Sequence, residues 1–245
     1  MNSSKITSRF SNLSPRKAAI IAGASLILMA LAAAFAYGWV FNSLVVPNDD
    51  EATVKAIRTS LFQFQLGILA WWLILILDIK VAWALYRFLK PVNNGFSILA
   101  AVFRVVYSVF LAKAIYNLCM VVVLINDPES IIFGAAEFNH AVMHFINAFT
   151  HIWQLGLIVF GLHLAILAYL ALKSGFVPNF LGILLAVAAL GYIVIPTSQQ
   201  LMPQYQSQIE TVESILSVPM AISEIGFAIW LLIKGGKVKI DATNT

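Results

Sequence analysis

Residues 61–88 read LFQFQLGILAWWLILILDIKVAWALYRF, an apolar run whose charged side chains are Asp78, Lys80 and Arg87. A helix rises ~1.5 Å per residue, so a helix over this run is longer than the ~30 Å hydrocarbon core of a bilayer. An apolar run of this length with so few charges predicts a transmembrane helix.

Similar runs recur along the chain, separated by segments rich in proline, glycine, asparagine and aspartate. We expect membrane spans near 18–42, 61–88, 96–125, 150–172, 178–196 and 213–233. Hydrocarbon forces each segment to satisfy its own backbone hydrogen bonds, and these runs lack the alternating pattern of barrel strands. The predicted fold is therefore all-α: an integral membrane bundle of six transmembrane helices over 18–236, with tails at 1–17 and 237–245.

The composition excludes several classes of protein. Hydrophobic residues make up 61% of the chain and charged residues 11%, whereas soluble domains carry roughly 25% charged residues. The net charge of +4 comes from residues scattered at the ends of the runs, without a basic stripe, so nucleic acid is not expected as a partner. Cys119 is the single cysteine, which rules out a disulfide within the chain.

The charges indicate an orientation, because lysine and arginine mark the cytoplasmic side of short loops. Basic residues on the side of the amino terminus are Lys5, Arg9, Arg16, Lys17, Arg87, Lys90, Lys173, Lys234, Lys237 and Lys239, against Lys55 and Arg58 on the other side. The other side holds the acidic residues Asp49, Asp50, Glu51, Asp127, Glu129, Glu137, Glu210 and Glu213. We therefore expect a multi-pass protein of the inner (cytoplasmic) membrane with both termini in the cytoplasm.

Two segments outside the spans have a less regular pattern. Asp49 or Asp50 is placed to cap a short helix over 51–60, since aspartate side chains accept hydrogen bonds from the first turn of a helix. Residues 131–149 have mixed polarity. They fit either an amphipathic helix in the outer interface or an extension of the fourth span, which lacks proline from Phe138 to Leu172.

Five ionisable side chains fall inside the predicted spans, where such groups are costly and usually face the interior of the bundle. They are Asp78, Arg104, Lys113, His163 and Glu224. Counting from the middle of each run places Asp78, His163 and Glu224 near the midplane, and Arg104 close enough for its long side chain to reach Asp78 or Glu224. Lys113 could pair with Glu224 instead. These residues are our candidate site for a small polar ligand, an ion or a proton; the alternative is that they only hold the helices together, at roughly 0.6–2 kcal/mol per hydrogen bond.

The histidines suggest a metal site that the pattern leaves incomplete. Glu137, His140, His144 and His151 share one helical face by their spacing. The motif lacks the glutamate of His-Glu-x-x-His, which supplies the general base of zinc proteases. The sequence also lacks a phosphate-binding loop and a Gly-x-Ser-x-Gly elbow. We expect no metal, cofactor or catalytic residue.

Several stretches resemble one bacterial multi-pass membrane family, catalogued as domain of unknown function 4386. Asp78 precedes Leu85-Tyr86-Arg87-Phe88-Leu89-Lys90-Pro91-Val92-Asn93 and Phe103-Arg104. Later stretches are similar too: Gly156 to His163, Lys173-Ser174-Gly175-Phe176-Val177-Pro178, Leu181 to Leu184, and Glu224 before Trp230 to Gly235. The resemblance runs from about residue 17 to 236 and implies a six-helix membrane protein with polar positions at Asp78, Arg104, His163 and Glu224. It implies no activity, and Lys113, His140 and His144 do not resemble family features.

These observations favour a small transporter or membrane sensor with an intramembrane site. Two alternatives stay open: an intramembrane enzyme on a lipid-soluble substrate, with Glu224 or His163 as its acid or base, and a structural or accessory subunit. The lipid bilayer is the expected partner, and a homo-oligomer is compatible with the sequence.

Overall fold

The computed structural model describes residues 14–127 and 134–237. Regular secondary structure within these residues is helical, and six helical segments are long and apolar enough to cross a membrane. They are Pro15–Leu44, Leu61–Leu89, Asn94–Asn126, Ala135–Lys173, Asn179–Leu201 and Pro203–Ile233. The predicted all-α fold with six transmembrane helices is confirmed, and the chain is a multi-pass membrane protein. Residues 1–13 and 238–245 of the predicted tails, and Glu129, lie outside the described residues.

Contacts within the chain form two compact units, a division that the apolar runs do not indicate. Unit 1 comprises Met1–Ile27, Asp78–Val105 and Ile158–Thr245, and unit 2 comprises Leu28–Leu77 and Val106–Leu157. The candidate residues Asp78, Arg104, His163 and Glu224 all belong to unit 1, and Lys113 belongs to unit 2.

The first span is not one regular helix. It consists of α2 (Pro15–Ala33), the π-helix η1 (Ala34–Phe41) and the short α3 (Asn42–Leu44). In unit 2, η1 lies close to α5 (Leu61–Leu89) at Gly67, where an added Cβ would lie 2.8 Å from Val40 Cγ1. A glycine at this point permits the close approach of two membrane helices.

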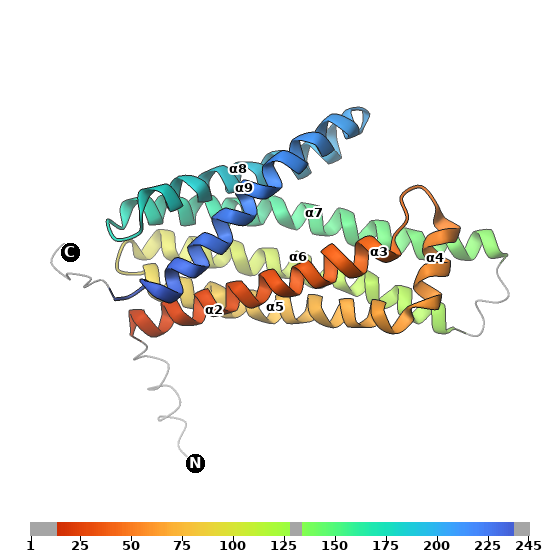
Figure 1. The fold of residues 1–245 in the computed structure, drawn as a ribbon, viewed down its shortest axis with the longest axis horizontal. Helices are drawn as coiled ribbons and strands as arrows, with labels where there is room; N and C mark the ends of the chain where they lie inside the picture. The colour runs from red at the N-terminus through yellow and green to blue at the C-terminus, as the bar shows by residue number, and fades with distance from the viewer. Residues whose placement is uncertain (1–13, 128–133, 238–245) are drawn as a thin grey trace, which may run out of the picture. The chain divides into compact units, whose positions relative to one another are not determined.

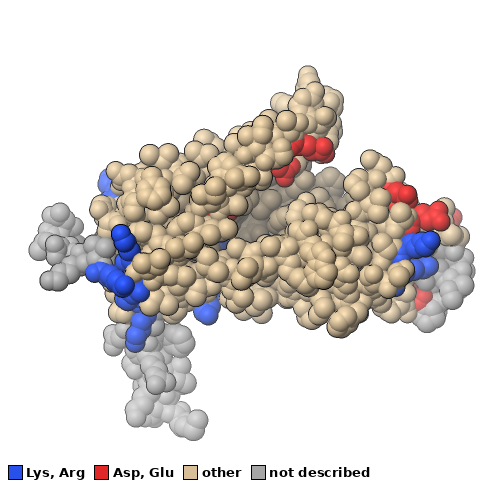
Figure 2. Space-filling view, in the orientation of Figure 1, with Lys and Arg blue, Asp and Glu red and all other residues tan. Residues whose placement is uncertain are grey.

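The short helix expected after the first span is α4 (Asp50–Thr59) in unit 2. Asp49 is its N-cap, because the side-chain Oδ1 accepts a hydrogen bond of 2.8 Å from the backbone N–H of Ala52. Acidic residues in the first turn and Arg58 in the last turn complement the helix dipole. Figure 2 shows these acidic and basic side chains together over α4.

The fourth span, α7 (Ala135–Lys173), settles one of the open alternatives. It follows α6 (Asn94–Asn126) and has 39 residues, so at ~1.5 Å per residue it is much longer than a ~30 Å hydrocarbon core requires. Residues 135–149 are thus an extension of the fourth helix and not a separate one. Residues 131–133 lie outside the described part of the chain.

The last two spans form an antiparallel hairpin in unit 1 (Figure 1). α8 (Asn179–Leu201) and α9 (Gln206–Ile233) are joined by the 3-10 turn η3 (Pro203–Tyr205), and both continue through an internal proline, Pro196 and Pro219. They extend into the Gln- and Ser-rich residues 197–212. The helices therefore begin and end beyond the purely apolar runs.

The end of α9 is held by Arg16 of α2, within unit 1. Arg16 Nη1 donates to the carbonyl of Gly235 at 2.7 Å and Nη2 to that of Leu232 at 2.9 Å. These carbonyls lack helical partners, and a cation there complements the helix dipole. In the space-filling view, acidic side chains lie toward the start of α9, beyond its first turn, and basic side chains lie near its other end (Figure 2).

Candidate functional site

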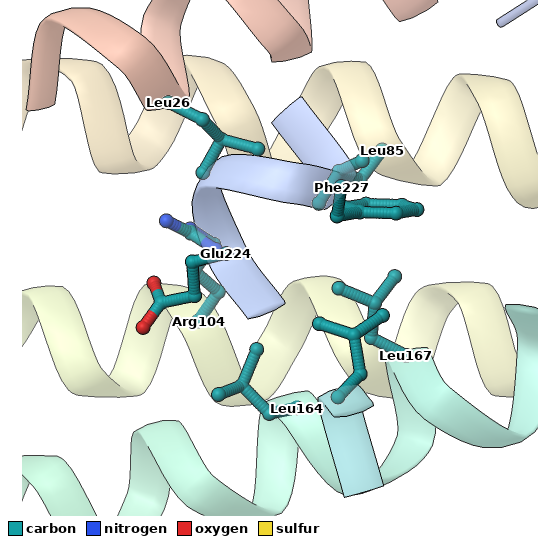
Figure 3. Close-up of a pocket in the computed structure, with 8 residues that line it drawn as sticks. Leu26, Leu85, Arg104, Leu164, Leu167, Glu224 and Phe227 are labelled. Carbon is teal, nitrogen blue, oxygen red and sulfur yellow. The ribbon is translucent and has the colours of Figure 1, made fainter. Parts of the chain in front are cut away.

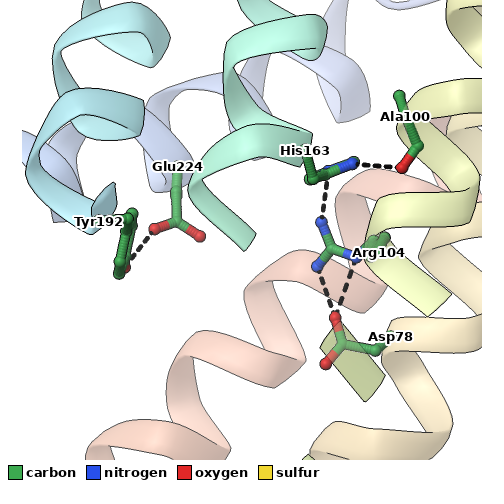
Figure 4. Close-up of polar contacts among 6 residues, drawn as sticks. All are labelled: Asp78, Ala100, Arg104, His163, Tyr192 and Glu224. Atoms are coloured by element: carbon green, nitrogen blue, oxygen red, sulfur yellow. Dashed lines mark hydrogen bonds and ion pairs between the residues drawn. The ribbon is translucent and has the colours of Figure 1, made fainter. Parts of the chain in front are cut away.

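An ion pair between α5 and α6 forms the centre of the site. Arg104 Nε donates to Asp78 Oδ1 at 2.9 Å, and Arg104 Nη2 lies 2.8 Å from the same oxygen (Figure 4). The side chains are 1% and 0% exposed. Burying two charges is costly, and attraction offsets that cost only with close geometry and further hydrogen bonds. The pair therefore fixes the rotation of α5 against α6 within unit 1.

His163 of α7 completes the coordination of the guanidinium. Its Nδ1 lies 2.8 Å from the carbonyl oxygen of Ala100, and its Nε2 lies 3.1 Å from Arg104 Nη1. The carbonyl can only accept and the guanidinium can only donate. Nδ1 therefore carries the hydrogen and Nε2 accepts, so this imidazole is neutral. Through it, Arg104 joins α5, α6 and α7.

Aromatic packing adds a further contact to the cation. The Cζ of Arg104 lies 5.2 Å from the ring centroid of Phe160, one turn before His163 on α7. A guanidinium at this distance from an aromatic ring gains a cation–π attraction, which is larger in a site without water. Phe160 also contacts the ring of Tyr192 edge-on at 5.1 Å. This ring therefore links the ion pair to α8.

Glu224 of α9 is the fourth ionisable residue of the site. Its Oε1 accepts a hydrogen bond of 2.7 Å from the hydroxyl of Tyr192 on α8. Glu224 and Arg104 both line a small pocket in unit 1 (Figure 3). The space open to the centre of a water molecule is about 10 Å³, about the least that one water needs. The other lining residues are Leu26, Leu85, Leu164, Leu167, Leu185 and Phe227.

The charges of the site do not balance if both carboxylates are ionised. Arg104 contributes one positive charge, Asp78 and Glu224 contribute one negative charge each, and His163 is neutral by its hydrogen bonds. In addition, Asp78 Oδ2 is buried without a hydrogen-bond partner among residues 14–127 and 134–237. Uncompensated charge in a low-dielectric interior is expensive. The site therefore carries one negative charge in excess when both carboxylates are ionised, and Glu224 is the carboxylate that lines the pocket, where a proton or a positive group could balance that charge.

The structure brings together four of the five residues singled out from their depth in the spans. Arg104 contacts Asp78 and His163 directly and shares a pocket with Glu224. The sequence did not single out Tyr192, an aromatic residue inside an apolar run, as a partner of Glu224. Its only signal is a hydroxyl in the middle of a span, where a hydrogen-bond partner is required.

Lys113 is exposed on α6 in unit 2. Its ammonium lies 4.8 Å from the ring centroid of Tyr116, one turn along the same helix. The carboxylate of Glu224, its expected alternative partner, accepts a hydrogen bond from Tyr192 within unit 1.

The four weak metal candidates lie on α7 in unit 2. Glu137, His140, His144 and His151 are all exposed, while Val142, Met143, Ile146 and Phe149 on the opposite side of the helix are buried. The predicted shared face thus points away from the core of this unit. Across the described residues, no three His, Cys, Asp or Glu side chains are grouped closely enough to hold a metal ion.

Comparison with protein families gives one match over most of the chain. The family described as "Domain of unknown function (DUF4386)" matches residues 21–235. The chain belongs to this family. The match confirms the resemblance seen in the sequence. The matched range includes the four residues of the site, Asp78, Arg104, His163 and Glu224.

The description of an archaeal relative names no activity either. An "Uncharacterized protein" of Archaeoglobus fulgidus is 34% identical over 166 residues, which cover 68% of this chain and 82% of that protein. No solved structure matches this member of DUF4386. Its function therefore has to be argued from the site itself.

Proposed function

We propose that this chain is a small transporter or membrane sensor of the inner membrane, and that the buried site of Asp78, Arg104, His163 and Glu224 takes up a small polar ligand, an ion or a proton. The observation that carries the proposal is the pocket lined by Arg104 and Glu224, beside an ion pair that is already complete. Ionisable groups inside membrane helices commonly mark ion and substrate pathways.

A purely structural role explains only part of the cluster. Asp78, Arg104 and His163 bind one another and hold α5, α6 and α7 together, although Asp78 Oδ2 has no hydrogen-bond partner among the described residues. Glu224 adds a second carboxylate to a buried site that is electrically neutral without it, and α8 and α9 could pair through apolar residues at lower cost. A third charge beside a pocket is better explained by binding than by packing.

The membrane and the orientation rest on charge. Along α9, Glu210 and Glu213 lie in the second and third turns, and Lys234 follows the last turn. This distribution supports the predicted orientation with Lys234 on the cytoplasmic side. Both termini are then cytoplasmic, as expected for an even number of spans.

Ligand-induced stabilisation tests the function without knowledge of the substrate. The protein in lipid nanodiscs is unfolded thermally with sodium, potassium, chloride or phosphate, and across acidic to alkaline pH. A bound ligand at 100 times its Kd stabilises the native state by about 2.7 kcal/mol. We expect one probe to stabilise the wild type and to lose its effect in Glu224→Gln, while Glu213→Gln, an exposed position on the same helix, keeps it. If Glu224→Gln and Glu213→Gln respond identically to every probe, Glu224 binds no ligand and the structural role is the one that stands.

A further inference from the structure

The geometry points to a proton as the ligand of this site, carried on the carboxylate of Glu224 and exchanged while the Asp78–Arg104–His163 cluster stays fixed. This inference rests on the proposed function and names its ligand. It follows from the size of the pocket, the chemistry of its walls and the hydrogen bond that Tyr192 makes.

The walls of the pocket exclude a coordinated metal cation. Hard cations in proteins take six to eight oxygen ligands, or an octahedral shell that includes water. Of the eight lining residues, six are leucine or phenylalanine, and Glu224 is the one that supplies side-chain oxygens. The guanidinium of Arg104 in the same wall would also repel a metal ion. A proton needs only one carboxylate oxygen and no coordination shell.

The size of the pocket excludes larger ligands. Its interior has room for about one water molecule, with an accessible volume of about 10 Å³. An anion would face the carboxylate of Glu224 across this space, and a substrate of several atoms does not fit. A single water beside Glu224 is enough to deliver or accept a proton.

The neighbours of Glu224 oppose one another, which suits a group that exchanges a proton. Arg104 of α6 and the hydroxyl of Tyr192 on α8 favour the carboxylate. The negative charge of Asp78 on α5 and the apolar walls favour the protonated acid, because like charge and a dry surrounding both disfavour a second carboxylate. The neutral His163 of α7 adds no charge that would stabilise the carboxylate. The walls come from α2, α5, α7, α8 and α9, as Leu26, Leu85, Leu164, Leu167, Leu185 and Phe227.

The hydrogen bond to Tyr192 assigns the reacting atom. Oε1 accepts from the hydroxyl, which leaves Oε2 as the oxygen that takes the proton. On protonation, an O–H bond of a hydronium ion breaks as the O–H bond on Oε2 forms, which leaves water and a neutral carboxylic acid. On deprotonation, the O–H bond on Oε2 breaks and the proton returns to a water molecule. Water is the one co-reactant in both directions. Tyr192 is a positioning residue, since it orients the carboxylate of α9 from α8.

Infrared difference spectroscopy tests the inference on the full chain in nanodiscs. Going from alkaline to acidic pH, each carboxylate that takes up a proton adds a carbonyl stretch, so we define the Glu224 band as the component that the wild type gains and Glu224→Gln does not; this band moves when glutamate is labelled with ¹³C. Glu224→Gln should lose the band, and Glu213→Gln, the matched position on the same helix, should keep it. Tyr192→Phe should keep the band but shift it to higher frequency, since a hydrogen bond to the carbonyl is lost.

The outcomes separate this inference from the proposed function. A band that persists in Glu224→Gln, or that is insensitive to Tyr192→Phe, overturns the assignment of the proton to Glu224. If sodium or chloride stabilises the wild type through Glu224 and no such band forms, the site binds an ion and the proton inference fails alone. If the Glu224 band forms but no probe and no change of pH alters the stability of the protein, the proposed function fails.

Discussion

Replacing Arg104 by glutamine should be among the most destabilising single changes in unit 1. The guanidinium makes two contacts with Asp78 Oδ1 and one with His163 Nε2, and both charged side chains are at most 1% exposed. Glutamine is too short and carries no charge. It therefore leaves Asp78 buried without a counter-charge and Nε2 of the imidazole without a donor.

The size of the effect follows from the unpaired charge and not from the count of lost bonds. Removing one partner of a buried ion pair costs about 3–5 kcal/mol in proteins, because the remaining charge stays desolvated. A whole domain is stable by about 5–15 kcal/mol, so Arg104→Gln should remove a large share of it. Removing both charges, in Asp78→Asn with Arg104→Gln, avoids the unpaired carboxylate. The double variant should be more stable than the sum of the single losses predicts, by about 0.5–3 kcal/mol.

A double-mutant cycle of unfolding free energies measures this coupling. Unfolding in bicelles is followed for the wild type, Arg104→Gln, Asp78→Asn and the double variant. Lys113→Gln is the matched control, since Lys113 lies on the same helix but is exposed, and it should change stability by no more than about 0.5 kcal/mol.

Two results would refute the reasoning about Arg104. One is a loss in Arg104→Gln no greater than that in Lys113→Gln. The other is strict additivity of the two single variants, which would mean that Asp78 and Arg104 do not stabilise each other.

Three further predictions follow from local geometry. Gly161→Ala should lower the free energy of unfolding by about 1–3 kcal/mol, because the added methyl would lie 2.6 Å from a side-chain carbon of α8. Gly38→Ala is the control, since an added methyl there meets nothing within 4 Å, and it should cost no stability. Equal losses in the two variants would contradict this prediction. Arg16→Gln should lose about 0.3–1 kcal/mol and speed amide hydrogen exchange in the last turn of α9, whose carbonyls Arg16 binds; unchanged exchange there would count against the cap. Cysteines replacing Lys90 and Asp127 should react with an impermeant maleimide from opposite sides of the membrane, and labelling from one side would reject the proposed orientation.

The sequence predicted which charged residues could meet, but it did not predict every partner. Counting along the spans placed Arg104 within reach of Asp78 or Glu224, and the structure selects Asp78. The contact between Arg104 and His163 and the bond from Tyr192 to Glu224 were not predicted. Depth follows from the rise of a helix, whereas the choice of partner depends on which helices are neighbours and how each is rotated.

Local irregularities were also beyond the sequence pattern. The π-helix η1 occurs in a run that contains only apolar and aromatic residues and one glycine, and nothing in that composition indicates it. By contrast, Asp49 at the start of α4 was predictable, because capping depends on neighbouring residues of the same segment.

The sequence by itself determined that this protein crosses the bilayer six times as helices, and it indicated the residues whose burial needs a reason. Only the tertiary structure decided that Arg104 is shared between Asp78 and His163, and that Glu224 lines a pocket with Arg104 and accepts a hydrogen bond from Tyr192. The reason is physical: in a membrane, the surface that faces lipid and the surface that faces another helix are both apolar. The sequence therefore encodes the length of each helix far more clearly than its rotation, and the rotation determines which polar groups meet.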